Sequence, residues 1–231
     1  MEKIYEGKTK DVYRLGDGNY QLLFKDDMTG TDGVFDPGAN TVGLTVEGAG
    51  LAGLAMSVHF FKLLTELGFP THFISAEENK MTVRPAAGFG GGLEVICRYK
   101  ALGSFIRRYG DSIREGAALD ALVEMTLKND ECGDPLINED SLMALGILKP
   151  GEYNEIKSLT QRISAAIKAD LAAKGLELCD IKLEFGKDKE GRIMLMDEIS
   201  GGNMRVMENG VTIQPLDLSK KILYNQGSST E

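Results

Sequence analysis

The residues best suited to chemistry lie in residues 180–186 and in the segment that returns toward them, residues 193–198. Read as a β-strand, the first segment alternates strictly, so that Asp180, Lys182 and Glu184 share one face and apolar side chains share the other. A half-buried strand with a solvated polar face would by itself explain this alternation. Its partner, however, is apolar on both faces. That pattern predicts a place inside a sheet, with the charged face over a covered cleft.

The length of the turn between these two strands decides which acidic residue joins the cluster. If four residues of the linker 187–191 form the turn, Asp197 faces Asp180 and shares the side of Glu184; if five do, Glu198 takes that place. Either way, two carboxylates and a lysine converge. Buried carboxylates need a counter-charge or a metal. The set suits Mg²⁺ and a polyphosphate, because the cation prefers oxygen ligands and an ammonium group neutralises phosphate charge.

A second candidate site lies near the N-terminus, in the sequence Glu6-Gly7-Lys8-Thr9-Lys10. A glycine within a strand lets the backbone approach a ligand closely. Lys8 and Lys10 are two residues apart and would project to one face of that strand. Such a hairpin could lie over a triphosphate. The alternative is that these lysines only protect the exposed edge of a sheet.

Arg98, Gly103 and Ser104 form a third candidate site. They combine a cation at a strand end with a glycine and a hydroxyl group at the start of a helix, and helix N-termini and arginine both bind phosphate. A serine N-cap with a basic surface explains the same residues equally well. Lys128 and Asp130 lie in a polar segment that is, by itself, typical of a turn.

Several common catalytic and nucleotide-binding motifs are absent from the sequence. The glycines of residues 88–92 do not fit a dinucleotide fingerprint, because the last glycine is misplaced and a strand follows. There is no P-loop and no G-x-S-x-G motif. The two histidines, His59 and His72, give little support to a histidine-based metal site or to Ser-His-Asp catalysis, since His59 falls within a helix, where a core or surface role is usual.

Length and composition predict a globular protein of one large domain or two small ones, with 231 residues, 42% hydrophobic and 26% charged. The net charge of −9 disfavours nucleic acid and anionic membranes and leaves small phosphorylated molecules as partners. No apolar run approaches membrane-spanning length, and no signal peptide is recognisable. Cys97, Cys132 and Cys179 are odd in number and widely spaced, which favours free thiols in a reducing cytoplasm.

Hydrophobic periodicity predicts the elements that position these side chains. Antiparallel hairpins with interspersed helices indicate an α+β fold rather than a doubly wound sheet. The glycine-rich residues 28–53 are expected to form a loop. Strands are expected in a hairpin over 2–27, in a hairpin over 71–76 and 80–85, over 93–99, and in the pair described first. Helices are expected over residues 54–67, 105–109, 117–125, 152–173 and 216–224.

Seven segments, in this order, resemble the phosphoribosylaminoimidazole-succinocarboxamide synthase (SAICAR synthetase) family. They span residues of about 3 to 208 and are YEGKTKDVY, FKDDMTGTDG, LGFPTHFI, EVICRYKALGS, LKNDECGDPLIN, LCDIKLEFG and DEISGGNMRV. The sixth looks like the family signature D-x-K-x-E-F-G, and the fourth looks like its signature E-x-x-x-R-x-x-A-x-G-S. Seven ordered matches are much more specific than any one of them.

The resemblance implies an ATP-grasp-like, glutathione-synthetase-like architecture of two α+β lobes, with antiparallel sheets, flanking helices and the nucleotide between them. The lobes are expected over residues 1–85, with the glycine- and lysine-bearing hairpin over ATP, and over 86–231, with the metal and substrate sites. The implied activity is an ATP- and Mg²⁺-dependent amide ligase of purine biosynthesis. It phosphorylates the carboxylate of carboxyaminoimidazole ribotide, and the amine of L-aspartate then attacks the acyl phosphate. A homodimer is compatible with this assignment.

The family pattern also implies roles for ten residues of this chain. Phosphates of ATP would contact Lys8 and Lys10, and Mg²⁺ would be held by Glu184 and Asp197. The phosphate of the ribotide would be bound by Arg98, Ser104 and Arg205. Three residues would lie close to the reacting groups: Lys128, Asp130 and Lys182.

The chain departs from the family pattern mainly where the acceptor substrate should bind. An aspartate of the family is Gly202 here, and a tryptophan is Met207. An asparagine is Gly53, another is Tyr99, and a proline is Gly92. Loss of an acidic group changes which hydroxyl or amine a pocket can pair. The alternatives are therefore a ligase for a different carboxylate and amine, or an ATP-binding module without turnover. The complete metal set argues against the module, and the three residues assigned to the ribotide phosphate favour the family reaction.

Overall fold

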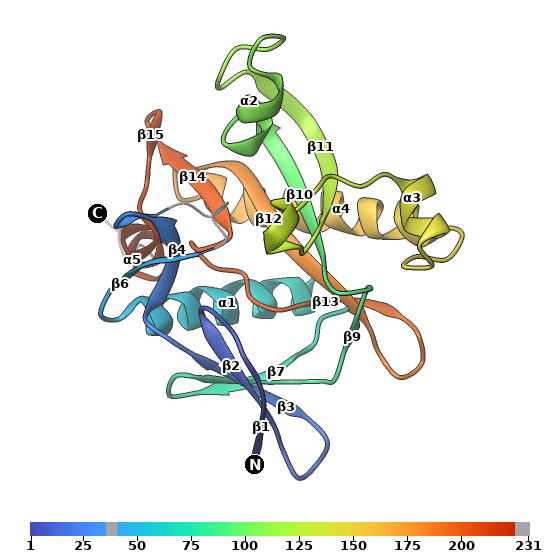
Figure 1. The fold of residues 1–231 in the computed structure, drawn as a ribbon. Coiled ribbons are helices and arrows are strands. Elements are labelled where there is room, and N and C mark those ends of the chain that lie inside the picture. Colours follow the sequence, from blue (N-terminus) through green and yellow to red (C-terminus); the bar gives the residue numbers. More distant parts are fainter. Residues whose placement is uncertain (36–40, 225–231) are drawn as a thin grey trace.

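The computed structural model describes residues 1–35 and 41–224, and these form an α+β fold with three antiparallel sheets (Figure 1). The last residues of the lobe expected over 86–231 therefore lie outside the described part. The first sheet contains only strands from the first 83 residues of the chain. Its order is β1 (Glu2–Glu6), β2 (Lys10–Arg14), β3 (Tyr20–Phe24), β8 (Lys80–Val83) and β7 (Phe73–Glu77).

The second sheet is centred on the long strand β12 (Glu177–Lys187). Its order is β11 (Ala118–Leu127), β10 (Leu93–Lys100), β12, β14 (Met204–Glu208) and β15 (Val211–Thr212). β12 also pairs with β13 (Ile193–Met196) and with β9 (Ala87–Gly88). The small third sheet is β5 (Val34–Phe35), β4 (Asp27–Thr31) and β6 (Val42–Thr45).

Two long helices connect these sheets into one body. In Figure 1 helix α1 (Ala49–Glu66) runs between the first sheet and the second. It contacts β3 and β7, and also α4 (Glu152–Ala172) and α5 (Pro215–Tyr224). α4 packs on β10, β11 and β12. The remaining helical segments are α2 (Ser104–Tyr109), the 3₁₀ turn η1 (Asp130–Cys132) and α3 (Glu139–Ala144).

Hydrophobic spacing explains why the long helices form and where they pack. In α4, Ile156, Ile163 and Ile167 recur at intervals of four and seven residues, and all three are fully buried. They belong to a continuous core that also contains Phe60 of α1 and Leu195 of β13. The two sheets therefore share one hydrophobic core. No helix in the described ranges is long and apolar enough to span a membrane.

Most of the expected elements are confirmed, including the α+β class, the helix at 152–173 and the hairpin at 71–85. The helix expected over 117–125 is wrong, because residues 118–125 belong to β11, which pairs with β10 on both sides of an irregularity between Arg98 and Lys100. The loop expected over 28–53 is also wrong in part. It contains β4, β6 and the first turns of α1. In β11, β4 and β6, pairing with a neighbouring strand overrides local propensity.

The hairpin expected over residues 2–27 has three strands rather than two, because the chain turns between Glu6 and Lys10. The amide of Gly7 donates to the carbonyl of Lys10 at 2.8 Å across this turn. A Cβ atom on Gly7 would lie 2.6 Å from that carbonyl oxygen, so the close approach requires glycine. Lys8 and Lys10 therefore do not share the face of a single strand.

Candidate active site

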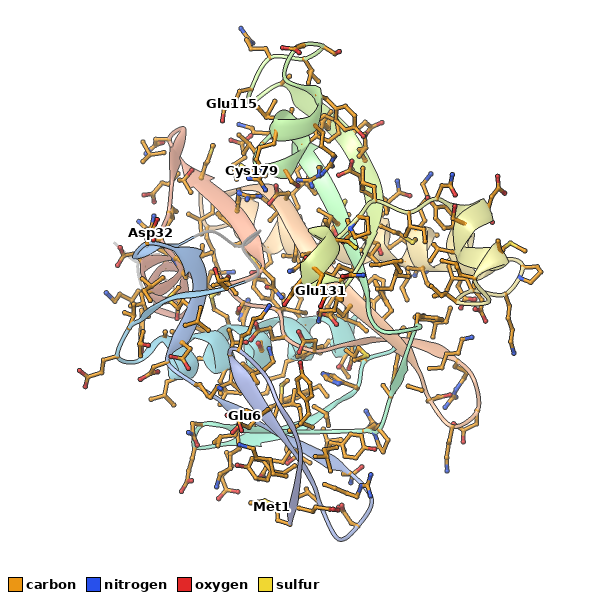
Figure 2. The ribbon with its side chains drawn as sticks, in the orientation of Figure 1. Met1, Glu6, Asp32, Glu115, Glu131 and Cys179 are labelled. Carbon is orange, nitrogen blue, oxygen red and sulfur yellow. The ribbon has the colours of Figure 1, made fainter. Side chains whose placement is uncertain are left out.

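A cleft of about 820 Å³ lies between the first and second sheets. Its walls come from β2 and β3 on one side and from β10 and β12 on the other, with the glycine-rich residues 88–92 and residues 196–203 at its ends. Figure 2 shows the side chains that fill the region between the sheets, with Glu131 of η1 labelled among them. Seven of the ten residues predicted for the site line this cleft: Lys8, Lys10, Lys128, Asp130, Lys182, Glu184 and Asp197.

Lys10 is the buried cation of the cleft. It opens β2, where its Cα partner in β3 is Phe24, and it is only 9% exposed. Its Nζ lies 3.2 Å from Oδ1 of Asp197 and 3.1 Å from Oε1 of Glu198. Burial opposes the charged form, but the two carboxylates raise the pKa of Lys10 above its usual value. The lysine is therefore charged and held in one position.

Lys8 lies in the turn before β2, where it is more exposed. Its Nζ contacts Oδ2 of Asp130 at 2.8 Å, so this ion pair joins the first sheet to η1 across the cleft. Lys25 supports the turn from behind, since its Nζ donates to the carbonyl of Gly7 at 2.6 Å. The structure thus brings Lys8 and Lys10 to the same cleft by a turn, not by strand alternation.

β12 contributes Lys182 and Glu184 to the cleft, as its alternation predicts. Nζ of Lys182 donates to Oε1 of Glu94 in β10 at 2.7 Å, and Nζ of Lys128 donates to Oε1 of Glu184 at 2.6 Å. Glu94 and Glu184 are Cα partners on adjacent strands. Burial opposes the charge of Lys128, but Glu184 and Asp197 raise the pKa of this lysine. Two lysine–carboxylate pairs therefore lie side by side on this wall.

Asp197 follows β13 and has a backbone φ of 67°. This left-handed conformation costs an L-residue roughly 1–2 kcal/mol, and such strain is common at functional sites. The Asp197 carbonyl accepts a hydrogen bond from Nε2 of His72 at 3.0 Å. Although desolvation in the cleft favours its neutral form, Lys10 and Lys128 hold the pKa of Asp197 below its usual range. Burial raises the pKa of the adjacent Glu198.

The carboxylates of Glu184 and Asp197 fit a Mg²⁺ ion bound together with a ligand. Burial and the charge of Asp197 both raise the pKa of Glu184, so the pair lacks positive charge even with Lys128 nearby. No group of three or more His, Cys, Asp or Glu side chains in residues 1–35 and 41–224 is arranged to hold a metal. Mg²⁺ is commonly bound by one or two carboxylates plus substrate phosphates, and two oxygen donors suffice for that mode.

Arg98, Ser104 and Arg205 form a separate charged cluster that does not line the cleft. Arg98 is 1% exposed, and its guanidinium donates to Ser104 at 2.8 Å and to Asp180 at 3.2 Å. Its Nε donates to Glu124 of β11 at 2.7 Å. Arg205 donates to the same oxygen of Asp180 at 2.9 Å. Asp180, which joins the two arginines, lies on β12, the strand that also carries Lys182 and Glu184.

Both strand registers expected for the β12–β13 hairpin are wrong. The ladder pairs Glu184 with Met196, and its pair next to the turn is Lys187 with Ile193. Lys187 therefore belongs to β12, and the turn is formed by residues 188–192 rather than by residues within 187–191. Asp197 therefore lies beyond the ladder, and neither Asp197 nor Glu198 faces Asp180. The Cα partners of Asp180 are instead Arg98 and Arg205. Two arginines on neighbouring strands neutralise this carboxylate, which is why it can be buried.

Three of the residues that were not among the predicted site residues make direct contacts to predicted ones. Glu94 pairs with Lys182, Glu198 pairs with Lys10, and His72 holds the backbone of Asp197. Glu94 stands first in the segment EVICRYKALGS and Glu198 was an alternative to Asp197, so the sequence contained a signal for both. His72 lies in the matched segment LGFPTHFI, but its role could not be predicted, because that role depends on a backbone carbonyl 125 positions away.

Three of the five departures from the family pattern, Gly53, Gly92 and Gly202, line the cleft, and Tyr99 and Met207 do not. Gly53 and Gly202 both lie beside Ser200, and added Cβ atoms would stand 3.7 and 3.2 Å from that side chain. Tyr99 lies on the other face of β10 from Arg98, where Lys168 of α4 stands 4.1 Å from its ring centroid. Tyr99 is therefore a packing residue between β10 and α4.

The fold and the site define a two-lobe α+β protein with a charged cleft between antiparallel sheets. The SAICAR synthetase family model matches residues 3–229 of the chain. The phosphoribosylaminoimidazole-succinocarboxamide synthase of Clostridium tetani is 58% identical, over 96% of this chain and all of its own length. The chain belongs to the SAICAR synthetase family.

Solved structures of the family have the same fold. A "SAICAR synthetase (Type-2) in complex with ADP" is 34% identical with a TM-score of 0.85, covering 99% of this chain and 100% of that one. The SAICAR synthetase of Pyrococcus horikoshii OT3 is 33% identical with a TM-score of 0.80, covering 92% and 95%. The expected fold class and family are thereby confirmed.

Proposed function

We propose that this chain is an ATP- and Mg²⁺-dependent amide ligase that joins carboxyaminoimidazole ribotide to L-aspartate in purine biosynthesis. Membership of the family and the 58% identity to a synthase of that name support the activity. The neighbour solved with ADP supports a nucleotide as ligand. The observation that carries the proposal is Lys10, a buried cation between two carboxylates at the floor of a cleft large enough for a nucleotide.

The reaction has two steps whose atoms balance without a protein nucleophile. A carboxylate oxygen of the imidazole attacks the γ-phosphorus of ATP, the bond to the β,γ-bridging oxygen breaks, and ADP leaves. The amine of aspartate then attacks the acyl carbon, phosphate leaves, and the new amide nitrogen loses a proton. Such chemistry needs positioning and charge neutralisation. A cleft with four lysines among its predicted site residues provides both.

Lys8 and Lys10 would bind the phosphates of ATP. Both now pair with carboxylates, Lys8 with Asp130 and Lys10 with Asp197 and Glu198. Glu184 and Asp197 would hold Mg²⁺, which supplies positive charge to the transferred phosphoryl group. The phosphates would then share cations that are already in place, which lowers the cost of organising the site.

On the acceptor side, Lys128, Asp130 and Lys182 would lie beside the carboxylate and amine that react. Lys128 and Lys182 stand on the cleft wall next to Glu184, the expected metal ligand. Arg98, Ser104 and Arg205 would bind the phosphate of the ribotide. Arg98 is buried among Glu124, Asp180 and Ser104, so the direct contact to that phosphate would fall mainly to Arg205, whose side chain is 18% exposed.

The decisive experiment is a reaction of the purified chain with Mg²⁺, ATP, carboxyaminoimidazole ribotide and L-aspartate. We expect one ADP, one phosphate and one succinocarboxamide per turnover, measured by chromatography and mass spectrometry. Omission of either Mg²⁺ or aspartate should abolish the product. Binding of ATP without product would contradict the assigned substrates, and absence of ATP binding would contradict the whole proposal. The cytoplasmic location, the homodimer and the lobe boundary at residue 85 stay predictions.

A further inference from the structure

Asp197 combines a strained backbone with a charge contact in the cleft. Its backbone is in the left-handed region at φ 67°, and its carboxylate contacts the buried Lys10. It also lies just past the last residue of β13, so the ladder with β12 does not hold its backbone. A strained residue outside a ladder keeps its conformation only if other contacts impose it.

His72 supplies such a contact. Its ring is buried, with 3% of the residue exposed, and Nε2 lies 3.0 Å from the carbonyl oxygen of Asp197. A carbonyl oxygen can only accept, so Nε2 must bear the hydrogen and His72 must donate. This hydrogen bond is directed at the peptide unit whose orientation decides where the Asp197 and Glu198 side chains point.

The backbone of His72 is itself fixed on both sides. Its amide donates to the carbonyl of Leu195 in β13 at 2.9 Å, and its carbonyl accepts from the amide of Arg84 at 2.7 Å. The ring of Phe61 in α1 lies 5.2 Å away from the imidazole, centroid to centroid. The imidazole is therefore held between α1 and the end of β13, and it moves with the strand that leads into Asp197.

We propose that His72 is a positioning residue for the metal site: its Nε2–H holds the Asp197 carbonyl and thereby aims the carboxylate of Asp197 into the cleft. The inference deepens the proposed function and rests on it, since that function gives Asp197 to Mg²⁺. His72 touches neither substrate nor metal in this role. An ordinary core histidine would fill the same space but would leave the metal site unaffected by loss of the donor.

Three substitutions of His72 separate the hydrogen bond from packing. The amide nitrogen of glutamine stands about where Nε2 of histidine stands, so His72→Gln keeps the donor. The amide of His72→Asn stands nearer Nδ1 and falls short of the Asp197 carbonyl. His72→Leu fills the space without a donor. His59→Leu is the matched control, because His59 is the other histidine of the chain and binds Asp170 of α4, outside the cleft.

The main readout is the factor by which Mg²⁺ tightens ADP binding, measured by calorimetry for each variant and independent of turnover. Loss of an outer contact to a metal ligand weakens metal binding by about 10–100-fold. We therefore expect His72→Leu and His72→Asn to reduce the Mg²⁺ enhancement at least about 10-fold, with His72→Gln close to the original chain. His59→Leu should lower the urea midpoint and leave the Mg²⁺ enhancement unchanged.

The Mg²⁺ concentration that gives half-maximal ATP turnover should rise in His72→Leu and His72→Asn and should stay close to the original value in His72→Gln. Equal Mg²⁺ enhancement in His72→Gln and His72→Asn would overturn the inference, and this pair decides the question even if His72→Leu does not fold. So would a comparable loss in His59→Leu, which would attribute the effect to stability. Failure of the proposed function has a different signature: the original chain would form no succinocarboxamide, whatever the ADP titrations show.

Discussion

At the scale of single residues, the site is organised by lysines that each face a carboxylate. Lys10 faces two, Lys128 faces Glu184, and Lys182 faces Glu94. In a low-dielectric cleft a charge without a partner is strongly unfavourable. Each pairing therefore offsets part of the cost of burying its two members, and a phosphate or a metal can bind by joining pairs that already exist.

Glu184→Gln tests the metal assignment. The amide keeps the shape but loses the negative charge, so Mg²⁺ affinity and Mg²⁺-dependent ATP turnover should fall by at least about 10–100-fold, the range seen even for outer-shell changes. The fold should persist, since Lys128 is partly exposed and can be solvated. Glu190→Gln, at an exposed position in the β12–β13 turn, is the control. Turnover at the original rate in Glu184→Gln, measured at limiting Mg²⁺, would show that the metal lies elsewhere.

Gly92 has an unusual relation to Lys128. Its φ is +128°, and an added Cβ would lie 2.6 Å from Cδ of Lys128 and 3.0 Å from its Cβ and Cγ. The amide of Lys128 also donates to the carbonyl of Gly92 at 3.0 Å. The side chain of Lys128 thus packs directly against the backbone of Gly92, and its Nζ contacts Glu184.

Gly92→Ala should therefore displace Lys128 and reduce turnover by about tenfold or more, in addition to a backbone strain of roughly 1–3 kcal/mol. Gly91→Ala is the matched control, because nothing lies within 4 Å of its added Cβ. A double-mutant cycle with Lys128→Ala identifies the route. If Gly92 acts through Lys128, Gly92→Ala lowers kcat no further in the Lys128→Ala background; additive losses of kcat would refute this.

At the scale of elements, burial in the central strands decides which thiols can react. Cys97 of β10 and Cys179 of β12 are fully buried, whereas Cys132 of η1 is exposed. Burial raises the pKa of the Cys97 thiol and raises that of Cys179 to about 12. A thiol reacts as its thiolate, so both buried thiols are inert at neutral pH.

Native labelling with a maleimide should therefore modify one cysteine per chain, and labelling in denaturant should modify three. Intact-mass spectrometry measures both numbers, and peptide mapping should place the native label on Cys132. Cys132→Ser should carry no label under native conditions. Rapid native modification of Cys97 or Cys179 would mean that β10 and β12 open far more readily than their central place in the sheet implies.

The sequence predicted those elements in which buried residues recur at a regular interval. The alternation of β12 and the helical spacing of α4 both follow from one buried face, so each could be read directly. β11 could not be predicted in this way, because its apolar spacing is also compatible with a helix. Only its pairing with β10 makes it a strand. The position of Asp197 depends on the turn length and on a left-handed residue, neither of which the strand period specifies.

At the scale of the whole molecule, α1 joins the two sheets that form the cleft. It packs on β3 and β7 of the first sheet and also contacts α4, which covers the second. His59 of α1 donates from Nε2 to Oδ2 of Asp170 in α4 at 2.9 Å, and Lys174 binds the other oxygen of Asp170 at 2.7 Å. These side chains are mostly buried, with exposed fractions of 19%, 17% and 14%. The cluster therefore resists separation of the two helices.

Asp170→Asn should lower the free energy of unfolding by roughly 1.5–3 kcal/mol, the range for hydrogen bonds to a charged group. Although burial opposes it, the bonds from His59 and Lys174 lower the pKa of Asp170. Its stabilisation is thus complete above the ordinary aspartate pKa of about 4 and is lost as the pH falls below that value. Urea unfolding should show the full difference between the two chains at pH 7 and a smaller one in acid. Glu78→Gln, whose partner Lys80 forms an exposed pair, should change stability by less than about 0.5 kcal/mol. Equal effects of the two substitutions would mean that the contact between α1 and α4 does not depend on this cluster.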